Sequence, residues 1–363
     1  MKVGIHQFSK QKLSDFEEIY EKILIHNHIE SIRLHASQPD FWKKIESIDF
    51  FLSRWLDTSD HHQLGHTILP IIEKDFKKGC LPNYHTYWHY DDKIKQFFQL
   101  KAHGFPAIDS YVFWDKQSAL SWMDSTELPV IFKLKGGASS SNVIMIKSRN
   151  RGKKLIKKIF GSGFISGKIP DKGHVKYQDF DIGKKIRHWG GNLLKTLNGE
   201  DINFRWQLHK NYALFQKFMP DNTFDTRVVV IGGRAFAFRR FNRENDFRAS
   251  GSKKLDLEPA NIDLRCIKLA QQVSRTLNYQ CMAYDFLYDE HNEPVICEIS
   301  YTHGQSVIKC PGYWDEEMNW HEGHYWPQYW HLVDLLGMPE LIQPDITIEE
   351  KSLNQKFFNI INK

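Results

Sequence analysis

The sequence predicts an α/β protein, in which a small parallel α/β domain precedes two larger units that mix helices and strands. In residues 1–90, short apolar runs alternate with helical patterns, which is typical of a parallel sheet with crossover helices. Residues 91–146 continue with two helix–strand pairs, whereas residues 213–305 are rich in strands. We therefore expect domains at 1–90, 91–210 and 211–340, followed by a tail at 341–363.

Composition limits the class of protein. The chain has 363 residues, of which 41% are hydrophobic and 26% charged, as in ordinary globular proteins. Its five scattered cysteines fit reduced thiols better than a disulfide framework or a zinc site. The first residues lack the apolar core of a signal peptide, and no run of about 18 apolar residues predicts a membrane span. We expect a cytoplasmic protein, and a net charge of +5 gives little reason to expect nucleic acid as a partner.

The elements of the first two units follow from local patterns. The runs "VGIHQF", "SIRLHA" and "IDFFLSRW" predict strands, and apolar residues from Leu13 to Leu24 recur at helical spacing between the first two. The stretch "DDKIKQFFQLKAHGFPAIDSYVFW" predicts a helix that ends at Gly104 and a strand after Pro106. A further helix precedes the strand "PVIFK", and "VIMIKS" predicts another strand.

The segment "PVIFKLKGGASSSNV", residues 129–143, ends an apolar strand with Lys133 and then turns into glycines and serines. Such a loop exposes backbone N–H groups and hydroxyls that suit an anion, and Gly136 and Gly137 allow positive φ and close approach to a ligand. The alternative is an ordinary β-hairpin with a flexible tip. The loop is not a Walker A sequence.

Residues 147–210 are strongly basic, with sixteen Lys and Arg against five Asp and Glu, and they show little periodicity. Such a stretch either binds an acidic partner, such as an acidic polysaccharide, a nucleotide-linked sugar or anionic lipid, or forms a solvated surface.

Two hairpins dominate the third unit. Gly232-Gly233 predicts a tight turn between the strands Arg227–Ile231 and Arg234–Arg240, and on this register Arg240 shares a face with Asp225. Paired arginines suit bidentate binding of carboxylate or phosphate, although a solvated strand end is the alternative. Arg248 follows in a polar loop.

The second hairpin, "CMAYDFLYDEHNEPVICEIS", places two carboxylates face to face. A two-residue loop at His291-Asn292 would put Asp285 opposite Glu298, with Ser300 on the same face and Cys297 in the core layer. Directly opposed carboxylates are unfavourable unless a cation lies between them. We expect a hard metal ion such as Mg²⁺, with neutralisation by a lysine or another register as alternatives.

In order and spacing these motifs resemble the ATP-grasp superfamily, especially ligases of the glutathione-synthetase and ribosomal-protein glutamate-ligase type. The resemblance covers about residues 91–304 and implies two α+β subdomains that grip ATP. It rests on "DDKIKQFFQLKAHGFPAI", "PVIFK" with its Gly/Ser loop, "FQKFMP", "FDTRVVVIGGRAFAFRR" with "FRASGS", and "YDF…CEIS".

The resemblance implies a role for each matched position. ATP phosphates would be bound by Lys93 and Lys133, with Ser139, Ser140 and Ser141 over the γ-phosphate. Adenine would be lined by Gln216, Lys217, Phe218 and Met219, and the ribose reached by Asp225. Mg²⁺ would be held by Asp285 and Glu298. Ser300 stands where the family usually has asparagine, which places the second metal position in doubt, and the linker lacks the acidic residue that is frequent there.

The implied activity is ATP-dependent carboxylate–amine ligation through an acyl phosphate, with Arg240, then Arg239 and Arg248, binding the substrate carboxylate. The acid is a small molecule or a saccharide, and the partner is an amine. A phosphotransferase of the same fold and a nucleotide-binding regulator without turnover are the alternatives.

The aromatic tail residues either stack on sugars or form the edge of a packed core. They are Trp314, Trp320, Tyr325, Trp326, Tyr329 and Trp330. Peripheral contact with a membrane is compatible with the basic stretch.

Overall fold

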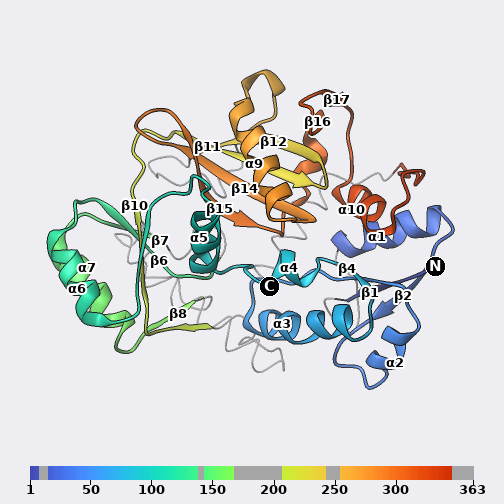
Figure 1. The fold of residues 1–363 in the computed structure, drawn as a ribbon, viewed down its shortest axis with the longest axis horizontal. Helices are drawn as coiled ribbons and strands as arrows, with labels where there is room; N and C mark the ends of the chain where they lie inside the picture. Colours follow the sequence, from blue (N-terminus) through green and yellow to red (C-terminus); the bar gives the residue numbers. More distant parts are fainter. Residues whose placement is uncertain (8–14, 138–142, 167–206, 243–253, 346–363) are drawn as a thin grey trace, which may run out of the picture.

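Three sheets and a short two-stranded ribbon organise the part of the chain that the structure describes. The computed structural model describes residues 1–7, 15–137, 143–166, 207–242 and 254–345. Figure 1 shows the N-terminal domain at the lower right, a first lobe at the left and a second lobe above them. We call residues 91–217 the first lobe and residues 218–322 the second lobe.

The N-terminal domain is a parallel sheet in the order β2-β1-β3-β4. Its strands are β1 Lys2–His6, β2 Glu30–Leu34, β3 Phe50–Leu52 and β4 Gly79–Leu81, and its helices are α1 Asp15–His26, α2 Phe41–Glu46, α3 Ser59–Lys74 and α4 Tyr84–Tyr87. Apolar side chains such as Val3, Ile5 and Phe51 are fully buried, because helices cover a sheet of this kind. The predicted small parallel domain is confirmed.

The first lobe is an antiparallel sheet in the order β5-β10-β6-β7, covered by two helices. Its elements are α5 Lys93–Ala102, β5 Ser110–Phe113, α6 Lys116–Ser125, β6 Val130–Lys133, β7 Val143–Ile146, α7 Arg149–Ile159 and β10 Ala213–Lys217, with β8 Phe164–Ser166 and β9 Gln207–His209 as a separate ribbon. Helices α6 and α7 pack on the sheet through Met123, Ile156 and Ile159.

The structure corrects two expectations for this lobe. Strand β10 pairs with β5 and β6, so a boundary at 210 would cut this sheet, and the division falls after Lys217. Part of the basic stretch is the helix α7, in which Ile156 and Ile159 face the core while Lys154 and Lys157 are exposed. The many lysines of this helix make its short apolar stripe hard to recognise in the sequence. Residues 167–206 lie outside the described residues.

The second lobe is one sheet of seven strands in the order β15-β14-β11-β12-β16-β17, with β13 paired to β12. Its elements are β11 Phe224–Ile231, β12 Arg234–Phe241, β13 Leu255–Asp256, η2 Pro259–Asn261, α9 Leu264–Thr276, β14 Cys281–Tyr288, β15 Pro294–Ser300, η3 Gln305–Lys309, β16 Gly312–Trp314 and β17 Trp320–Glu322. The predicted hairpin at Gly232-Gly233 is confirmed, since Ile231 pairs with Arg234 and Gly232 has a φ of 56°.

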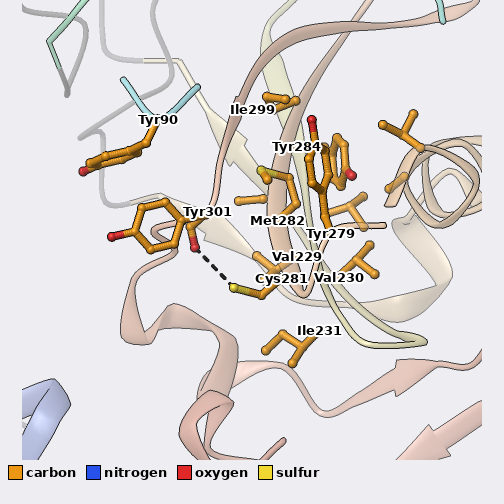
Figure 2. Packing of buried hydrophobic residues seen from close by; sticks show 14 of the residues in the cluster. Tyr90, Val229, Val230, Ile231, Tyr279, Cys281, Met282, Tyr284, Ile299 and Tyr301 are labelled. Atoms are coloured by element: carbon orange, nitrogen blue, oxygen red, sulfur yellow. Dashed lines mark hydrogen bonds between the residues drawn. The ribbon is translucent and has the colours of Figure 1, made fainter. Parts of the chain in front are cut away.

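The core of the second lobe lies on the face of this sheet that α9 covers. Val230, Met282 and Tyr284 are buried there, and Figure 2 shows them packed beside Tyr279. Alternation along β11 and β14 sends these side chains to the core and their neighbours to the other face. That other face carries the polar residues described below.

The aromatic residues between Trp314 and Trp330 mainly pack against other side chains of the protein. Trp314 and Trp326 are buried, and the guanidinium of Arg234 lies 3.9 Å from the ring centre of Trp330. Trp320 is the more exposed of these residues. Helix α10 Pro327–Leu336 then returns to the N-terminal domain and packs on α1 (Figure 1).

One backbone contact joins the two lobes directly. The N–H of Ile296 in β15 donates to the carbonyl of Pro106 (2.9 Å), and the N–H of Ile108 donates to the carbonyl of Ile296 (3.0 Å). No described helix is long and apolar enough to span a membrane.

Candidate functional site

A cavity of about 300 Å³ lies between the sheets of the two lobes. Its walls come from β6 and β10 on one side and from β11, β12, β14 and β15 on the other. Among the residues that the sequence singles out, the lining includes Lys93, Lys133, Gln216, Lys217, Phe218, Met219, Asp225, Arg240, Asp285, Glu298 and Ser300. Ser139, Ser140, Ser141 and Arg248 lie outside the described residues.

Lys93 enters the cavity from the first turn of α5. Asp92 caps this helix, because its carboxylate accepts from the N–H groups of Ile94 and Lys95. A cation at a helix N-terminus is unfavourable on its own. The Lys93 ammonium lies 3.1 Å from Glu298 and donates to the carbonyl of Gly137 at 3.0 Å. Burial lowers the pKa of Lys93, but Glu298 and then Asp91 outweigh this effect and raise it.

Lys133 ends β6, and its ammonium lies 3.8 Å from the sulfur of Cys297 across the cavity. The strand pairs with β7, so the segment is a hairpin whose first strand ends at the cavity. The interpretation as a β-hairpin and the interpretation as an anion-binding loop are therefore compatible for this segment. Its tip, residues 138–142, lies outside the described residues.

The glycines of this hairpin approach protein atoms closely. Asp91 accepts from the N–H of Gly137 at 2.7 and 2.9 Å, and Gly137 has a φ of 113°. A Cβ at Gly136 would lie 2.8 Å from a carboxylate oxygen of Asp91. Gly136 therefore lies close to this carboxylate, and its close approach to a ligand stays a prediction.

Asp285 and Glu298 face each other on β14 and β15, as the sequence predicts. The predicted two-residue loop is wrong, however. The strands end at Tyr288 and Pro294, and Asn292 in the loop has a φ of 58°.

A β-bulge in β15 brings Asp285 opposite Glu298 although the loop is longer than predicted. Phe286 pairs with Ile296 while Asp285 pairs with Glu298, so Cys297 is an extra residue in β15. The bulge turns Cys297 into the lining of the cavity, and its placement in the core layer is wrong. Burial raises the pKa of this thiol, although Lys133 opposes the effect.

Two arginines hold the Asp285 carboxylate. Arg227 donates to both of its oxygens at 2.7 Å, and Arg240 lies 2.8 Å from Oδ2. Burial raises the pKa of Asp285, but Arg227 and Arg240 outweigh it and hold the pKa well below its usual range. Such an arrangement fixes the position of each charged group.

Arg240 also pairs with the residue opposite it on β11. It donates to both oxygens of Asp225 at 2.7 Å, and the pair is buried. Burial raises the pKa of the Asp225 carboxyl even though Arg240 opposes this. Any ribose contact of Asp225 would therefore compete with this ion pair.

Arg239 lies on the other face of β12 and does not line the cavity. It binds Asp256, and its guanidinium lies 4.9 Å from the ring centre of Phe224. The geometry favours Arg240 over Arg239 as a cavity residue.

The adenine-linker candidates include the last two residues of β10 and the two residues that follow it. Gln216 donates to the hydroxyl of Ser110 at 3.2 Å, and Lys217 extends to Glu290 at 3.1 Å. Met219 is buried at the cavity wall. These positions suit a flat apolar ring between backbone groups.

The donor set fits a Mg²⁺ ion that is held largely by phosphates. Mg²⁺ is commonly bound by one or two carboxylates plus substrate phosphates. Glu298 is the more accessible carboxylate, and the bonds described for Asp285 leave a lone pair on Oδ1. Ser300 bonds to Thr302 at 3.0 Å, so its hydroxyl is a weaker candidate.

Several lining residues escape the sequence analysis. Arg227 could have been found by alternation, because it shares a face with Asp225 and lies opposite Asp285. Asp57 precedes α3 of the N-terminal domain, Tyr90 lies in the turn after α4, and Asp91 follows it. No local pattern links these positions to a site in another lobe.

Comparison with known proteins bears on this geometry. A family model described as a RimK-like ATP-grasp domain matches residues 194–311, which include Arg240, Asp285 and Glu298. A search of curated protein sequences found no match.

Solved structures resemble the chain over most of its length. The N5-carboxyaminoimidazole ribonucleotide synthetase of Thermotoga maritima has a TM-score of 0.55 at 12% identity, covering 94% of this chain and 78% of that one. The N5-carboxyaminoimidazole synthase of Aspergillus clavatus gives 0.54 at 10%, covering 97% and 79%. D-cycloserine synthetase DcsG gives 0.52 at 12%, covering 83% and 91%.

At these identities the structural likeness concerns the fold, and the family model concerns one domain. The chain therefore has the ATP-grasp fold, and its residues 194–311 match a RimK-like ATP-grasp domain.

Proposed function

We propose that the chain is an ATP-dependent ligase that joins a carboxylate to an amine through an acyl phosphate. The observation that carries this proposal is the convergence of Lys93, Lys133, Arg240 and Glu298 on one cavity between two lobes. Cations at that density suit a triphosphate and a second anion, and a carboxylate among them suits the accompanying metal ion.

In this proposal Lys93 and Lys133 bind the phosphates, and residues 216–219 hold the adenine. Ser139, Ser140 and Ser141 would complete the phosphate contacts. Glu298 would hold Mg²⁺ with Asp285, and the ion would neutralise charge on the transferring phosphoryl group. Lys93 would exchange its contact with Glu298 for a phosphate oxygen when the nucleotide binds.

The reaction has two steps. An oxygen of the substrate carboxylate attacks the γ-phosphorus, the bond to the β–γ bridging oxygen breaks, and ADP leaves. The amine nitrogen then attacks the acyl carbon, loses a proton, and inorganic phosphate leaves. Arg240 orients the carboxylate and stabilises the developing oxyanion, because a guanidinium stays charged and offers parallel donors.

The substrates are proposed by class. The relatives named above are synthetases, and the Aspergillus structure holds ADP and 5-aminoimidazole ribonucleotide, which favours small molecules. Asp57 and Tyr90 bring the N-terminal domain to the cavity wall, where they suit an amine-bearing acceptor. A saccharide carboxylate remains part of the proposal through the basic residues 147–210.

Single-turnover assays with Mg·ATP and panels of acids and amines test this function. A ligase releases ADP and free phosphate only when both substrates are present, and hydroxylamine in place of the amine traps the activated acid as a hydroxamate. Phosphate retained on an organic product would show a phosphotransferase, and ATP binding without release of ADP across the panels would contradict the proposal.

A further inference from the structure

Away from the ATP site, three metal-ligating side chains meet in the interior. They are Cys281 at the start of β14, His303 just after β15, and His331 on α10, all buried, with ligand atoms within 4.8 Å of one another. They are far apart in the sequence, so no local sequence motif indicates that they meet. Figure 2 shows the Cys281 thiol directed toward the carbonyl of Tyr301, which it meets at 3.7 Å.

The spacing of the two imidazoles suits a shared ligand. The Nε2 atoms of His303 and His331 are 3.2 Å apart. Two nitrogens bound tetrahedrally at about 2.0–2.1 Å from one zinc ion are separated by roughly 3.3 Å. The remaining nitrogen of His331 meets the hydroxyl of Tyr20 at 2.6 Å, which orients the ring as outer partners of ligating histidines do.

A small cavity borders all three side chains. Its volume is about 20 Å³, enough for one ion or one water, and its walls include Tyr20, Ser53, Arg54 and Thr302. The hydroxyl of Ser53 is buried there and has no hydrogen-bond partner among the described residues. A water bound to an ion in this cavity would supply the missing partner.

We propose that Cys281, His303 and His331 bind a thiophilic transition-metal ion, and that the favoured ion is Zn²⁺. One thiolate and two imidazoles are ligands that suit zinc and copper and do not suit Mg²⁺. Binding replaces the thiol proton by a sulfur–metal bond and releases that proton to solvent. The fourth position would be taken by water.

Burial affects the two kinds of ligand in opposite directions. Burial lowers the pKa of His303 to about 3, so its imidazole is neutral and offers a lone pair. Burial also raises the pKa of Cys281 to about 12, so the thiolate forms only with the metal present. Arg54 lowers the pKa of His303, and Asp334 raises the pKa of Cys281 and so opposes the thiolate.

The alternative is a chain of neutral hydrogen bonds. Tyr20 would donate to His331, and His331 to His303, whose other nitrogen lies 3.4 Å from the carbonyl of Gly304. This chain satisfies both rings, but it leaves the Ser53 hydroxyl and the cavity unexplained.

A metal here would connect three parts of the protein. Cys281 belongs to the second lobe, His331 to the helix α10, and Tyr20 to the N-terminal helix α1. Thr302, next to His303, lines the ATP-site cavity. The ion would therefore stabilise the junction behind the active site without contacting substrate.

The test begins with the full-length protein, purified under reducing conditions and dialysed against Zn²⁺ and then against metal-free buffer. Elemental analysis should find about one zinc per chain. Copper recovered from untreated protein would assign the same site to that ion. Replacement by Co²⁺ should give a thiolate-to-cobalt charge-transfer band in the near ultraviolet.

Matched variants locate the ion. Cys281→Ser should lose the cobalt band and most of the metal, whereas Cys310→Ser, which alters another buried cysteine, should keep both. A strong chelator should lower the Tm of the wild type and leave that of Cys281→Ser unchanged. Wild-type protein with no retained metal and no cobalt band would overturn the proposal, whether or not the variants fold. None of these readouts depends on ligase activity.

Discussion

Among single residues, Glu298 has the most direct consequence. It faces Asp285 and contacts Lys93 at 3.1 Å, so it connects the proposed metal to the proposed phosphate ligand. Glu298→Gln removes the negative charge and should weaken Mg·ATP binding roughly ten-fold or more. Calorimetry at several Mg²⁺ concentrations measures this. Glu293→Gln, an exposed acid of the same hairpin, is the control, and unchanged binding in Glu298→Gln would remove the metal assignment.

Lys133 offers a second test. If its ammonium binds a phosphate, Lys133→Ala removes a charge-assisted bond that contributes about 1.5–3 kcal/mol, so ATP should bind roughly ten- to 150-fold more weakly. Lys101→Ala changes a partly exposed lysine on α5 and should leave affinity unchanged. An effect below about twofold in Lys133→Ala would make Lys133 a structural residue of the hairpin.

Arg240 should act on turnover more than on nucleotide binding. Arg240→Lys keeps the charge but loses the planar fork that binds Asp225, and the turnover rate should fall by about 10²–10³ while ATP affinity stays within a few-fold. Arg239→Lys, on the opposite face, should remain active.

The Tm of both arginine variants must be measured alongside, because breaking a buried ion pair destabilises proteins by about 3–5 kcal/mol. The proposed role fails if Arg240→Lys loses ATP affinity and turnover equally while its Tm is unchanged.

At the scale of elements, the contact of α6 with α7 depends on Gly152. A Cβ at this position would overlap the Sδ and Cε atoms of Met123. Gly152→Ala should gain about 1 kcal/mol from helix propensity and lose about 1–3 kcal/mol from overpacking, so we expect a net decrease in stability. Denaturant unfolding measures it, with Lys154→Ala on the exposed face as the control. A stabilised Gly152→Ala would show that Met123 moves aside freely.

The elements also show what the sequence could predict. The hairpin at Gly232-Gly233 was predictable with its register, because two glycines between strands leave few turn geometries. In β14–β15 the pairing of Asp285 with Glu298 was correct although the loop was not, since the bulge at Cys297 compensates for the longer loop. A bulge has no sequence signal of its own here.

Contacts between distant segments were the part that could not be predicted. The pairing of β10 with β5 and β6, and the arrival of Asp57 at the cavity, depend on how whole units pack. Arg227 is the intermediate case, because simple alternation from Asp225 identifies it once the strand is known.

For the molecule as a whole, buried neutral histidines should make stability fall in mild acid. Burial lowers the pKa of His89 to about 3, with His85 and Lys95 adding to the effect, and lowers that of His209 to about 4. The unfolded chain takes up protons below a pH of about 6.5, whereas the folded state does not, so stability is lost as the pH falls from there. Each such group contributes on the order of 2 kcal/mol between pH 6.5 and 5.

His89→Phe tests this linkage. The ring nitrogens of His89 have no hydrogen-bond partner among the described residues, so the variant should lose little at pH 7.5 and keep the contact with Tyr279. The expected result is a Tm that falls less between pH 7.5 and 5 than that of the wild type. Parallel Tm curves would show that His89 is not part of the acid sensitivity.

The backbone contact at Ile296 has a mechanical consequence. By themselves, two hydrogen bonds to one residue resist separation of the lobes more than rotation about that point. Side-chain contacts such as Lys93 with Glu298, Lys217 with Glu290 and Gln99 with Tyr279 limit the extent of that rotation. Ile296 would then serve as a pivot. Glu298 is two residues from Ile296 on the same strand, so a rotation about Ile296 would move it little and keep it close to Lys93. The far end of the first-lobe sheet would move further. In the proposed function, the lobes would close on the nucleotide while Glu298, the proposed metal ligand, keeps its place.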